Sequence, residues 1–503
     1  MNPGKTRFLL TAALAGGLLG GCDSAADPTT ATTTTRHYGQ IAFSPCTLTS
    51  GSSTVEAQCG SLEVPENHDA PEDGRRISLR VAWLPAEEEA SAAPDPVFFL
   101  AGGPGQAAVS VWPVINSAFS EVRKQRHIVL VDQRGTGGSN ALDCHELKDE
   151  EPPTGEVDAA ALAAFAARCA AAVAGRADTR LYTTTDAIRD LDAVRGAIGV
   201  AKVDLVGVSY GTRVAQQYAM RYPQQVRSIV LDGVAPNDLV VGGEFANTFE
   251  DALALQSAQC SKLPACAERF GRDAREQLGE LVARLRSAPV QAEYRDPATG
   301  EVRTGTVDAD TVTGLAFMFS YMPQTAALLP LVLDEAMQGR YGSLLSLADL
   351  IGRNTGDSMA RGMQWSVICA EDADRHQVAA AGTGTVLGPE VARMFFAACP
   401  SWPHGSRPEG FNAPFRSELP VLLLSGELDP VTPPRYAERV LEGLPNGRHL
   451  VLRGQGHGAL GQGCMPKLVG RFIDTNDAAA LDASCLDTMT YVPPFTSFNG
   501  WEP

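Results

Sequence analysis

Short apolar segments alternate with amphipathic helical segments through much of the first half of the chain. Apolar residues fill whole segments, as in strands buried on both faces of a parallel sheet, at 97–100, 127–131, 203–208 and 228–231. Helical periodicity lies between and after them at 158–173, 185–198 and 213–222. Strands alternating with helices predict an α/β fold, in which a mostly parallel central sheet is flanked by helices.

The pattern changes on either side of this α/β part. Ahead of it, partly alternating strands are predicted at 41–43, 60–64 and 77–84. After residue 236 helices dominate, at 245–257, 273–285, 326–337 and 342–351, with one hairpin near 291–307, and strands return at 419–424 and 449–452. We therefore predict a first core part at 39–236, a largely helical cap at 237–415, and a second core part at 416–503.

The first residues have the pattern of an export signal. Lys5 and Arg7 precede an apolar run at 8–19, which is too short to span a membrane comfortably, and Leu-Gly-Gly-Cys ends at Cys22. This resembles a bacterial lipoprotein signal, in which residues 1–21 are removed and Cys22 carries the lipid; an ordinary signal peptide is the alternative. Residues 22–38 then read as a tether. We expect an exported protein, periplasmic or associated with the outer membrane, that reaches the membrane through this lipid only.

The cysteine count supports an oxidising compartment. Of eleven cysteines, ten follow Cys22, and an even number behind an export signal is typical of disulfides. The sequence leaves their connectivity open; our hypothesis is pairing in chain order, which closes short loops: 46 with 59, 144 with 169, 260 with 266, 369 with 399, and 464 with 485. Neither C-x-x-C nor H-E-x-x-H occurs, so no zinc site is expected.

Length and charge narrow the class of protein further. A chain of 503 residues can bury more than one core, and 44% hydrophobic residues with mixed charges fit a soluble globular protein. A formal net charge of −18 repels phosphate, and no basic cluster offsets it. Nucleic acid is therefore excluded as a partner.

A nucleophile elbow is indicated where segment 203–208 meets the following helix. Residues Gly207-Val208-Ser209-Tyr210-Gly211 match G-x-S-x-G with a strand before and a helix after. Such a turn needs glycine on either side and holds the serine hydroxyl clear of the backbone, near a helix N-terminus that favours negative charge. The motif by itself is common in a glycine-rich chain, so the serine hypothesis depends on finding its partners.

A serine becomes nucleophilic when a base takes its proton and an acid orients that base, and this fold places them in the order serine, acid, histidine. His457 lies in a glycine-rich loop just past segment 449–452, and we take it as the base, whereas His449 inside that segment reads as structural. Asp429 follows segment 419–424 and precedes two prolines, and we take it as the acid, with Glu427 as the fallback.

Two backbone N–H groups should stabilise the negative oxygen that forms during attack on a carbonyl. One is expected from Tyr210, directly after the serine. The other is expected from the glycine-rich turn Ala101-Gly102-Gly103-Pro104-Gly105-Gln106, where we choose Gly103, with Gly102 second.

Together these motifs resemble the α/β-hydrolase peptidases related to proline iminopeptidase and, more closely, tripeptidyl aminopeptidase. The resemblance covers about residues 95–236 and 365–470 and includes Asp-Gln-Arg-Gly-Thr-Gly-Gly-Ser at 132–139. It implies an α/β-hydrolase fold and removal of residues from peptide N-termini. Ala101 stands where proline iminopeptidases carry a histidine, which argues against proline specificity. In the 132–139 motif we expect Asp132 and Arg134 to brace the glycine turn.

An aminopeptidase must also recognise a positive α-amine, which requires carboxylates. Glu371 and Asp372 are our candidates, and a solvated acidic surface is the alternative. The aromatic and methionine-rich segment 317–322 reads as core packing, or as the lining of an apolar pocket.

The sequence thus predicts a lipid-anchored, monomeric serine hydrolase that acts on peptides, with Ser209, His457 and Asp429 as catalytic triad. An acyl-enzyme forms and is released by water, so no metal or organic cofactor is expected. Two alternatives stay open: an esterase of small acyl esters, and a non-catalytic envelope-binding protein on a hydrolase scaffold.

Overall fold

A ten-stranded sheet organises the chain, and the computed structural model describes residues 34–72, 74–147, 159–355, 359–376 and 382–500. In spatial order the strands are β1 (Arg36–Tyr38), β2 (Ile41–Ser50), β3 (Ser53–Pro65), β4 (Arg76–Leu84), β6 (Ile128–Val131), β5 (Val97–Leu100), β7 (Val203–Val208), β8 (Val226–Asp232), β11 (Val421–Gly426) and β12 (Gly447–Leu452). Pairing is antiparallel from β1 to β6 and parallel from β6 to β12. The predicted mostly parallel α/β sheet is confirmed, behind an antiparallel N-terminal extension.

Each central strand buries side chains on both faces of the sheet. Phe98 and Leu423 pack in one apolar cluster, while their neighbours Phe99 and Leu424 pack in another on the opposite face. The first cluster includes side chains of α3 (Ala159–Val173), α4 (Thr184–Ile198) and α5 (Tyr210–Arg221), and the second those of α1 (Ala108–Ile115) and α16 (Met465–Thr475). This two-sided burial is why the strands read as unbroken apolar runs in the sequence.

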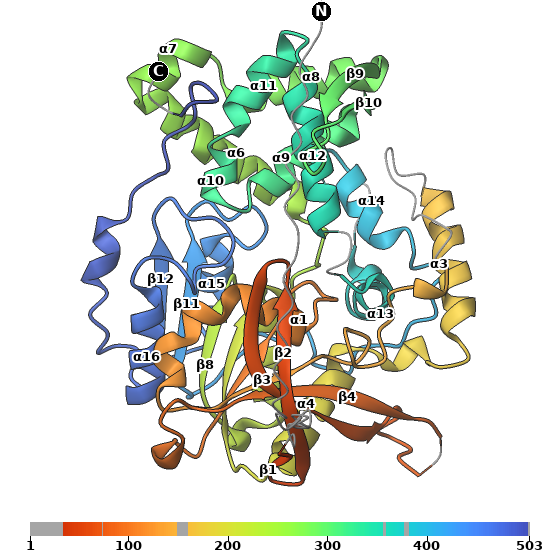
Figure 1. Cartoon of the computed structure of the whole chain (residues 1–503), viewed down its shortest axis with the longest axis vertical. Helices are drawn as coiled ribbons and strands as arrows, with labels where there is room; N and C mark the ends of the chain where they lie inside the picture. The colour runs from red at the N-terminus through yellow and green to blue at the C-terminus, as the bar shows by residue number, and fades with distance from the viewer. Residues whose placement is uncertain (1–33, 73, 148–158, 356–358, 377–381, 501–503) are drawn as a thin grey trace, which may run out of the picture. The chain divides into compact units, whose positions relative to one another are not determined.

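Between β8 and β11 the chain forms a helical insertion with a hydrophobic cluster of its own. Leu278, Leu315 and Leu333 are among its fully buried residues. Figure 1 shows these helices grouped together in the upper part of the view, above the ten-stranded sheet. They are α6 (Phe245–Lys262), α7 (Pro264–Phe270), α8 (Ala274–Ser287), α9 (Ala309–Phe319), α10 (Pro323–Ala326), α11 (Leu329–Met337) and α12 (Gly342–Thr355). The hairpin predicted near 291–307 is present as β9 (Val290–Arg295) and β10 (Val302–Val307).

The last part of the predicted cap belongs to the sheet's own core. Met363 and Trp365 of α13 (Arg361–Glu371) and Trp402 lie in the cluster that covers one face of the sheet. The indole rings of Trp365 and Trp402 are 5.3 Å apart, and Trp365 also meets Phe165 of α3. The predicted cap, 237–415, included these residues because the alternation of strands and helices stops after residue 236, and that pattern does not show which apolar layer a segment joins. The other α-helices in the described residues are α2 (Ser120–Arg123), α14 (Glu390–Phe396) and α15 (Pro434–Leu441).

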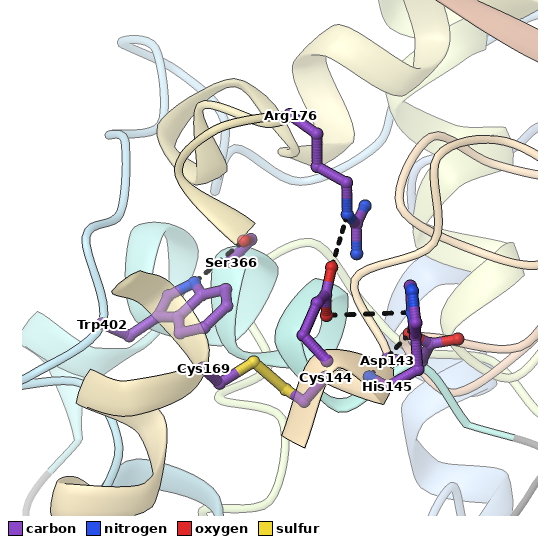
Figure 2. The surroundings of a disulfide bond; sticks show 8 residues. Asp143, Cys144, His145, Cys169, Arg176, Ser366 and Trp402 are labelled. Atoms are coloured by element: carbon purple, nitrogen blue, oxygen red, sulfur yellow. Dashed lines mark hydrogen bonds and ion pairs between the residues drawn. A yellow bond between two sulfur atoms is a disulfide. The ribbon is translucent and has the colours of Figure 1, made fainter. Parts of the chain in front are cut away.

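The five disulfides in the described part of the chain join the cysteines in chain order, as predicted. Figure 2 shows Cys144–Cys169, which ties the loop after β6 to α3, close to Trp402, whose indole Nε1 donates to Ser366 Oγ at 2.9 Å. Each bond links segments near in sequence, so each restricts a local loop of the unfolded chain.

The N-terminal predictions fall largely outside the described residues. Cys22 and the signal segment 1–21 are among the residues not described. The tether was expected to reach residue 38, but Arg36–Tyr38 form β1 and pair with β2. Among the described helices, none combines the length and apolar character needed to cross a bilayer.

A C-terminal strap, defined here as residues 484–500, runs from the sheet core to the cap. It begins with a 3-10 turn at Ser484–Thr488, and Cys485 is bonded to Cys464 just before α16. Further on, Phe495 N donates to Ala327 O at 2.8 Å, and its side chain packs on a cluster that includes Phe270 of α7. Figure 1 accordingly shows the last part of the strap beside α7.

Gly211 should be intolerant of any side chain. A Cβ atom there would lie 2.1 Å from Leu100 O, so β5 and α5 would have to separate. We expect Gly211→Ala to lower the free energy of unfolding by about 1–3 kcal/mol in urea titrations.

Gly314→Ala is the matched control, because Gly314 lies inside α9 with nothing within 4 Å of an added Cβ. This control should raise the free energy of unfolding by roughly 0.5–1 kcal/mol. Equal effects of the two substitutions would refute the close-approach argument.

Candidate active site

The candidate residues follow neighbouring parallel strands at their carboxyl ends. The glycine turn 101–106 follows β5, Ser209 follows β7, Asp429 follows β11 and His457 follows β12. These strands are neighbours in the order β5, β7, β8, β11, β12. The fold therefore brings residues far apart in sequence to one edge of the sheet, where ligands bind in open α/β folds.

Ser209 occupies a strained turn between β7 and α5. Its backbone has φ 55° and ψ −124°, a conformation that L-residues rarely adopt. The turn is held by Ser209 N donating to Asp232 O at 2.8 Å. Added Cβ atoms would lie 2.4 Å from Gly211 O at Gly207 and 2.1 Å from Leu100 O at Gly211. The two glycines of the motif are thus required by close contacts of the main chain.

Asp429, which is buried, and His457, which is half-buried, form a hydrogen-bonded pair. His457 Nδ1 lies 2.7 Å from Asp429 Oδ2. The other carboxylate oxygen, Oδ1, accepts from the backbone N–H groups of Val431 and Thr432 at 2.9 and 2.8 Å. The hydroxyl of Thr432 donates to Oδ2 at 2.8 Å and lies 3.0 Å from His457 Nδ1. Asp429 is only 2% exposed, so these donors replace its water shell.

Electrostatics favour the charged state of this pair. Burial by itself would lower the pKa of His457, but the charge and hydrogen bond of Asp429, with the charge of Asp232, raise it above its ordinary value. Burial by itself would raise the pKa of Asp429, but His457 and the backbone donors lower it. A carboxylate beside an imidazole that readily accepts a proton is the arrangement a general base requires.

Asp232 is a functional candidate that the sequence analysis did not identify. Its carboxylate accepts from Ala459 N at 2.9 and 2.8 Å and from Leu460 N at 2.9 Å, so it fixes the chain just after His457. Burial raises the pKa of Asp232 to about 6. The signal in the sequence that could have identified Asp232 is its position: it is an acidic residue at the end of a buried strand, followed by a glycine.

The imidazole of His457 also lies close to the serine elbow. A Cβ atom on Gly233 would meet His457 Cε1 at 3.0 Å, and Gly233 follows the residue whose carbonyl holds Ser209 N. Nδ1 is engaged by Asp429, which leaves Nε2 as the nitrogen for proton exchange. Within the described residues, no hydrogen bond joins the Ser209 hydroxyl to His457.

The cap contributes Tyr321 to the histidine loop. His457 N donates to Tyr321 O at 2.8 Å, and the Tyr321 ring stands edge-on to the imidazole at 5.4 Å. The Phe317 ring is half-buried and lies 5.4 Å from the Tyr321 ring, whereas Phe319 is 3% exposed inside the cap core. The segment 317–322 therefore divides: one face packs the cap, and the other covers His457.

The glycine turn lies against the serine as an oxyanion site would. A Cβ on Gly102 would be 3.1 Å from Ser209 Cβ, and Gly103 has φ 109°. In the described part of the chain, the N–H groups of Gly103 and Tyr210 have no hydrogen-bond partner. Tyr210 is held by its hydroxyl, which lies 2.6 Å from Thr184 Oγ1 and accepts from Gln133 Nε2 at 3.1 Å.

The motif at 132–139 supports this region in two ways. Asp132 accepts from Val109 N at 2.9 Å and from Gly138 N at 3.0 Å, so it braces the chain just after the glycine turn, as expected. Arg134 points elsewhere: it binds the Asp190 carboxylate at 2.6 and 2.7 Å and the carbonyl of Glu66 at 2.8 Å. Its role is to join β3 and α4, which corrects our expectation for this residue.

Glu371 and Asp372 do not offer a substrate the free carboxylates we expected. Both are 0% exposed and face the buried Arg213, whose Nη1 lies 3.7 Å from Glu371 Oε2 and 3.0 Å from Asp372 Oδ2. Glu371 also accepts from the Thr184 backbone and hydroxyl at 2.7 and 2.9 Å. Burial raises the pKa of Glu371 to about 7 although Arg213 opposes the shift. An unpaired arginine inside the core is costly, so these carboxylates serve Arg213.

Away from the residues discussed so far, the described part of the chain contains one group of side chains that could hold a metal ion: Asp143, His145 and Glu146. Figure 2 shows Asp143 and His145 beside the Cys144–Cys169 disulfide. All three residues are exposed, and Glu146 accepts from Arg176 Nε at 2.6 Å. Exposed acidic groups of this kind are common on protein surfaces, and this one lies outside the candidate active site.

Comparisons with known proteins agree with this geometry. A family model described as the alpha/beta hydrolase fold matches residues 95–463. Serine protease Hip1 of Mycobacterium tuberculosis is 27% identical over 470 residues, which cover 85% of this chain and 87% of that protein.

Two further relatives match over shorter segments. Tripeptidyl aminopeptidase of Streptomyces coelicolor is 29% identical over 189 residues, 35% of each chain. Proline iminopeptidase of Neisseria gonorrhoeae is 29% identical over 148 residues, 29% of this chain and 35% of that one. The resemblance to α/β-hydrolase peptidases is confirmed, and with it the prediction of a hydrolytic enzyme.

The charge of Asp429 should control the titration of His457. We expect the imidazole pKa of His457, followed by NMR, to lie above the ordinary 6.5 in the native protein. Asp429→Asn should lower it by about 1–3 pH units, because the attraction is lost while burial persists.

His449 provides the control in the same spectra, since burial lowers its pKa and Asp429 is not among the causes. A His457 pKa unchanged in Asp429→Asn would contradict the proposed pairing, and equal shifts in both histidines would indicate a general structural change.

Proposed function

The chain belongs to the α/β-hydrolase family, and from this premise we propose that it is a serine peptidase that removes residues from peptide N-termini. The observation that carries the proposal is the hydrogen-bonded pair of Asp429 and His457, 2.7 Å apart, at the strand edge that also carries Ser209 in its strained elbow. A histidine so paired is the base that a serine hydroxyl requires.

The proposed reaction uses residues of this chain alone. Ser209 Oγ attacks the carbonyl carbon while His457 Nε2 takes the hydroxyl proton, and Asp429 stabilises the resulting imidazolium. The N–H groups of Gly103 and Tyr210 donate to the oxyanion. The imidazolium then gives its proton to the leaving amine, the peptide bond breaks, and Ser209 holds the acyl group as an ester. Water, deprotonated by His457, releases the acyl group and restores the serine.

The gap between Ser209 and His457 must close during this reaction. Hydrogen bonds between catalytic groups often tighten only when substrate is bound. The surrounding contacts leave few groups to move: Asp429 fixes Nδ1, Asp232 fixes the loop after His457, and Asp232 O fixes Ser209 N. A rotation of the serine hydroxyl about its Cα–Cβ bond is the simplest closing motion.

Peptide specificity is supported by the relatives and by the cap. A serine protease matches this chain over most of both lengths, and a tripeptidyl aminopeptidase matches over a third of each. Tyr321 places cap residues directly against the histidine loop, so a folded protein would be excluded while the end of a flexible peptide could enter.

A carboxylesterase is the second candidate function. The observation in its favour is that Glu371 and Asp372 are engaged by Arg213, so amine recognition by these carboxylates is lost. Ester cleavage would use the same serine, base and oxyanion donors. It would not require a group that binds the α-amine of a substrate.

We also propose that the protein is exported and anchored through a lipid on Cys22. The support is the sequence pattern ahead of Cys22 together with the five disulfides, which form and persist in oxidising compartments.

A fluorophosphonate probe should label this protein at one site. We expect stoichiometric labelling of the native protein and none in Ser209→Ala, with peptide hydrolysis reduced on the order of 10⁶-fold. Ser425→Ala is a matched control, because Ser425 is a buried hydroxyl bonded to His449 at 2.9 Å. A native protein that folds but takes no label would rule out the enzyme in favour of a binding protein.

Anilide substrates should separate the two hydrolytic functions. We expect the native enzyme to cleave tripeptidyl p-nitroanilides that carry a free amine, with kcat/KM at least about tenfold higher than for the N-acetylated forms, since amine recognition is part of the proposal. Cleavage of p-nitrophenyl esters alone, with no response to blocking the amine, would favour the esterase.

A further inference from the structure

Glu427 links the two loops that carry the proposed acid and base. It follows β11 two residues before Asp429, and its Oε2 accepts from Gly454 N at 2.9 Å, three residues before His457. Backbone bonds run in parallel, from Glu427 N to Leu452 O at 3.0 Å and from Leu428 N to Gln455 O at 2.8 Å. These three hydrogen bonds therefore fix the distance between the acid loop, which carries Asp429, and the histidine loop, which carries His457.

The other oxygen of Glu427 binds the C-terminal strap. Tyr491 OH donates to Glu427 Oε1 at 2.8 Å. A Cβ on Gly454, which has φ 68°, would lie 2.9 Å from Tyr491 Cα, so the strap's main chain rests directly on the histidine loop. One half-buried carboxylate thus joins three segments: the acid loop, the histidine loop and the strap.

The strap then reaches the cap segment that covers His457. Phe495 N donates to Ala327 O at 2.8 Å, at the end of α10, and Tyr321 lies just before α10. The strap, Leu428 and Gly454 also enclose a cavity of about 40 Å³ with α6, α10 and α11, so the strap lies between the catalytic loops and the cap. The strap contacts the histidine loop on one side. On the other side it contacts the end of α10, the helix that follows Tyr321.

We propose that Glu427 and Tyr491 are positioning residues, through which the strap holds Asp429, His457 and Tyr321 in register for catalysis. The proposal rests on the proposed function, because it concerns the rate of the step that His457 assists. Glu427 acts as a hydrogen-bond acceptor for Gly454 N–H and Tyr491 O–H and takes no part in proton transfer. This assigns a role to the carboxylate that the sequence left as the alternative triad acid.

Substitutions at Glu427 separate positioning from acid catalysis. Glu427→Gln keeps both bonds, since the amide oxygen accepts from Gly454 N–H and the amide NH₂ donates to the rotated Tyr491 hydroxyl. We expect this variant to keep kcat within about threefold of the native enzyme. Glu427→Ala loses both bonds, and its kcat per labelled site should fall roughly 10- to 100-fold with KM within about twofold.

Tyr491→Phe tests the strap with the smallest change. It removes one hydroxyl and one hydrogen bond, and kcat per labelled site should fall about three- to tenfold, with KM nearly unchanged. Tyr341→Phe is the control, because Tyr341 OH accepts a single bond from Arg284 Nη2 at 3.1 Å within the cap. It should leave kcat per labelled site unchanged.

The readout is turnover divided by the number of sites that a fluorophosphonate labels, on the full chain. A role in stability alone would reduce the labelled fraction and leave turnover per labelled site at the native value in both Glu427→Ala and Tyr491→Phe; that result overturns the proposal. A Glu427→Gln variant as impaired as Glu427→Ala would also overturn it, by assigning the carboxylate's charge a direct role. Absence of label in the native enzyme would instead reject the proposed function.

Discussion

The hydrogen bond between Asp429 and His457 is the contact on which the site depends. With the carboxylate buried and 2.7 Å from Nδ1, it holds the imidazole in one orientation and favours its charged form. Almost every nearby feature serves it: Thr432 donates to the carboxylate, Asp232 fixes the chain beyond the histidine, and Tyr321 covers the ring. In the proposed reaction, this pair is what makes the hydroxyl of Ser209 nucleophilic.

The fold holds the serine elbow at the same sheet edge as this pair through close contacts of the main chain. Gly207 and Gly211 let β7, α5 and the end of β5 meet at distances that exclude a Cβ, and the strained backbone of Ser209 is supported by the carbonyl of Asp232. Strain of this kind persists only where the surroundings impose it. The sheet core thus maintains a conformation at its edge that an isolated turn would not adopt.

Much of this could be predicted from the sequence because the signals are local. Unbroken apolar runs gave the parallel strands, glycines flanked Ser209, and Asp429 and His457 each followed a strand. Other features depend on tertiary contacts that no local pattern records. Glu371 and Asp372 look like a free acidic surface until Arg213, far away in sequence, is placed against them. Likewise, α13 lies within the range predicted as cap but completes the sheet's core, and Glu427 acquires its partners only when Gly454 and Tyr491 converge on it.

In the proposed reaction, Ser209, activated by His457, becomes covalently attached to the carbonyl carbon of the substrate. The most direct test of this attachment is mass spectrometry of the intact protein, quenched in acid during turnover of an activated p-nitrophenyl ester and then mapped by proteolysis. We predict one added acyl mass on the peptide that contains Ser209, accumulating within the first turnover. Turnover without any acylated Ser209 peptide, or an acyl group found on another residue, would contradict it.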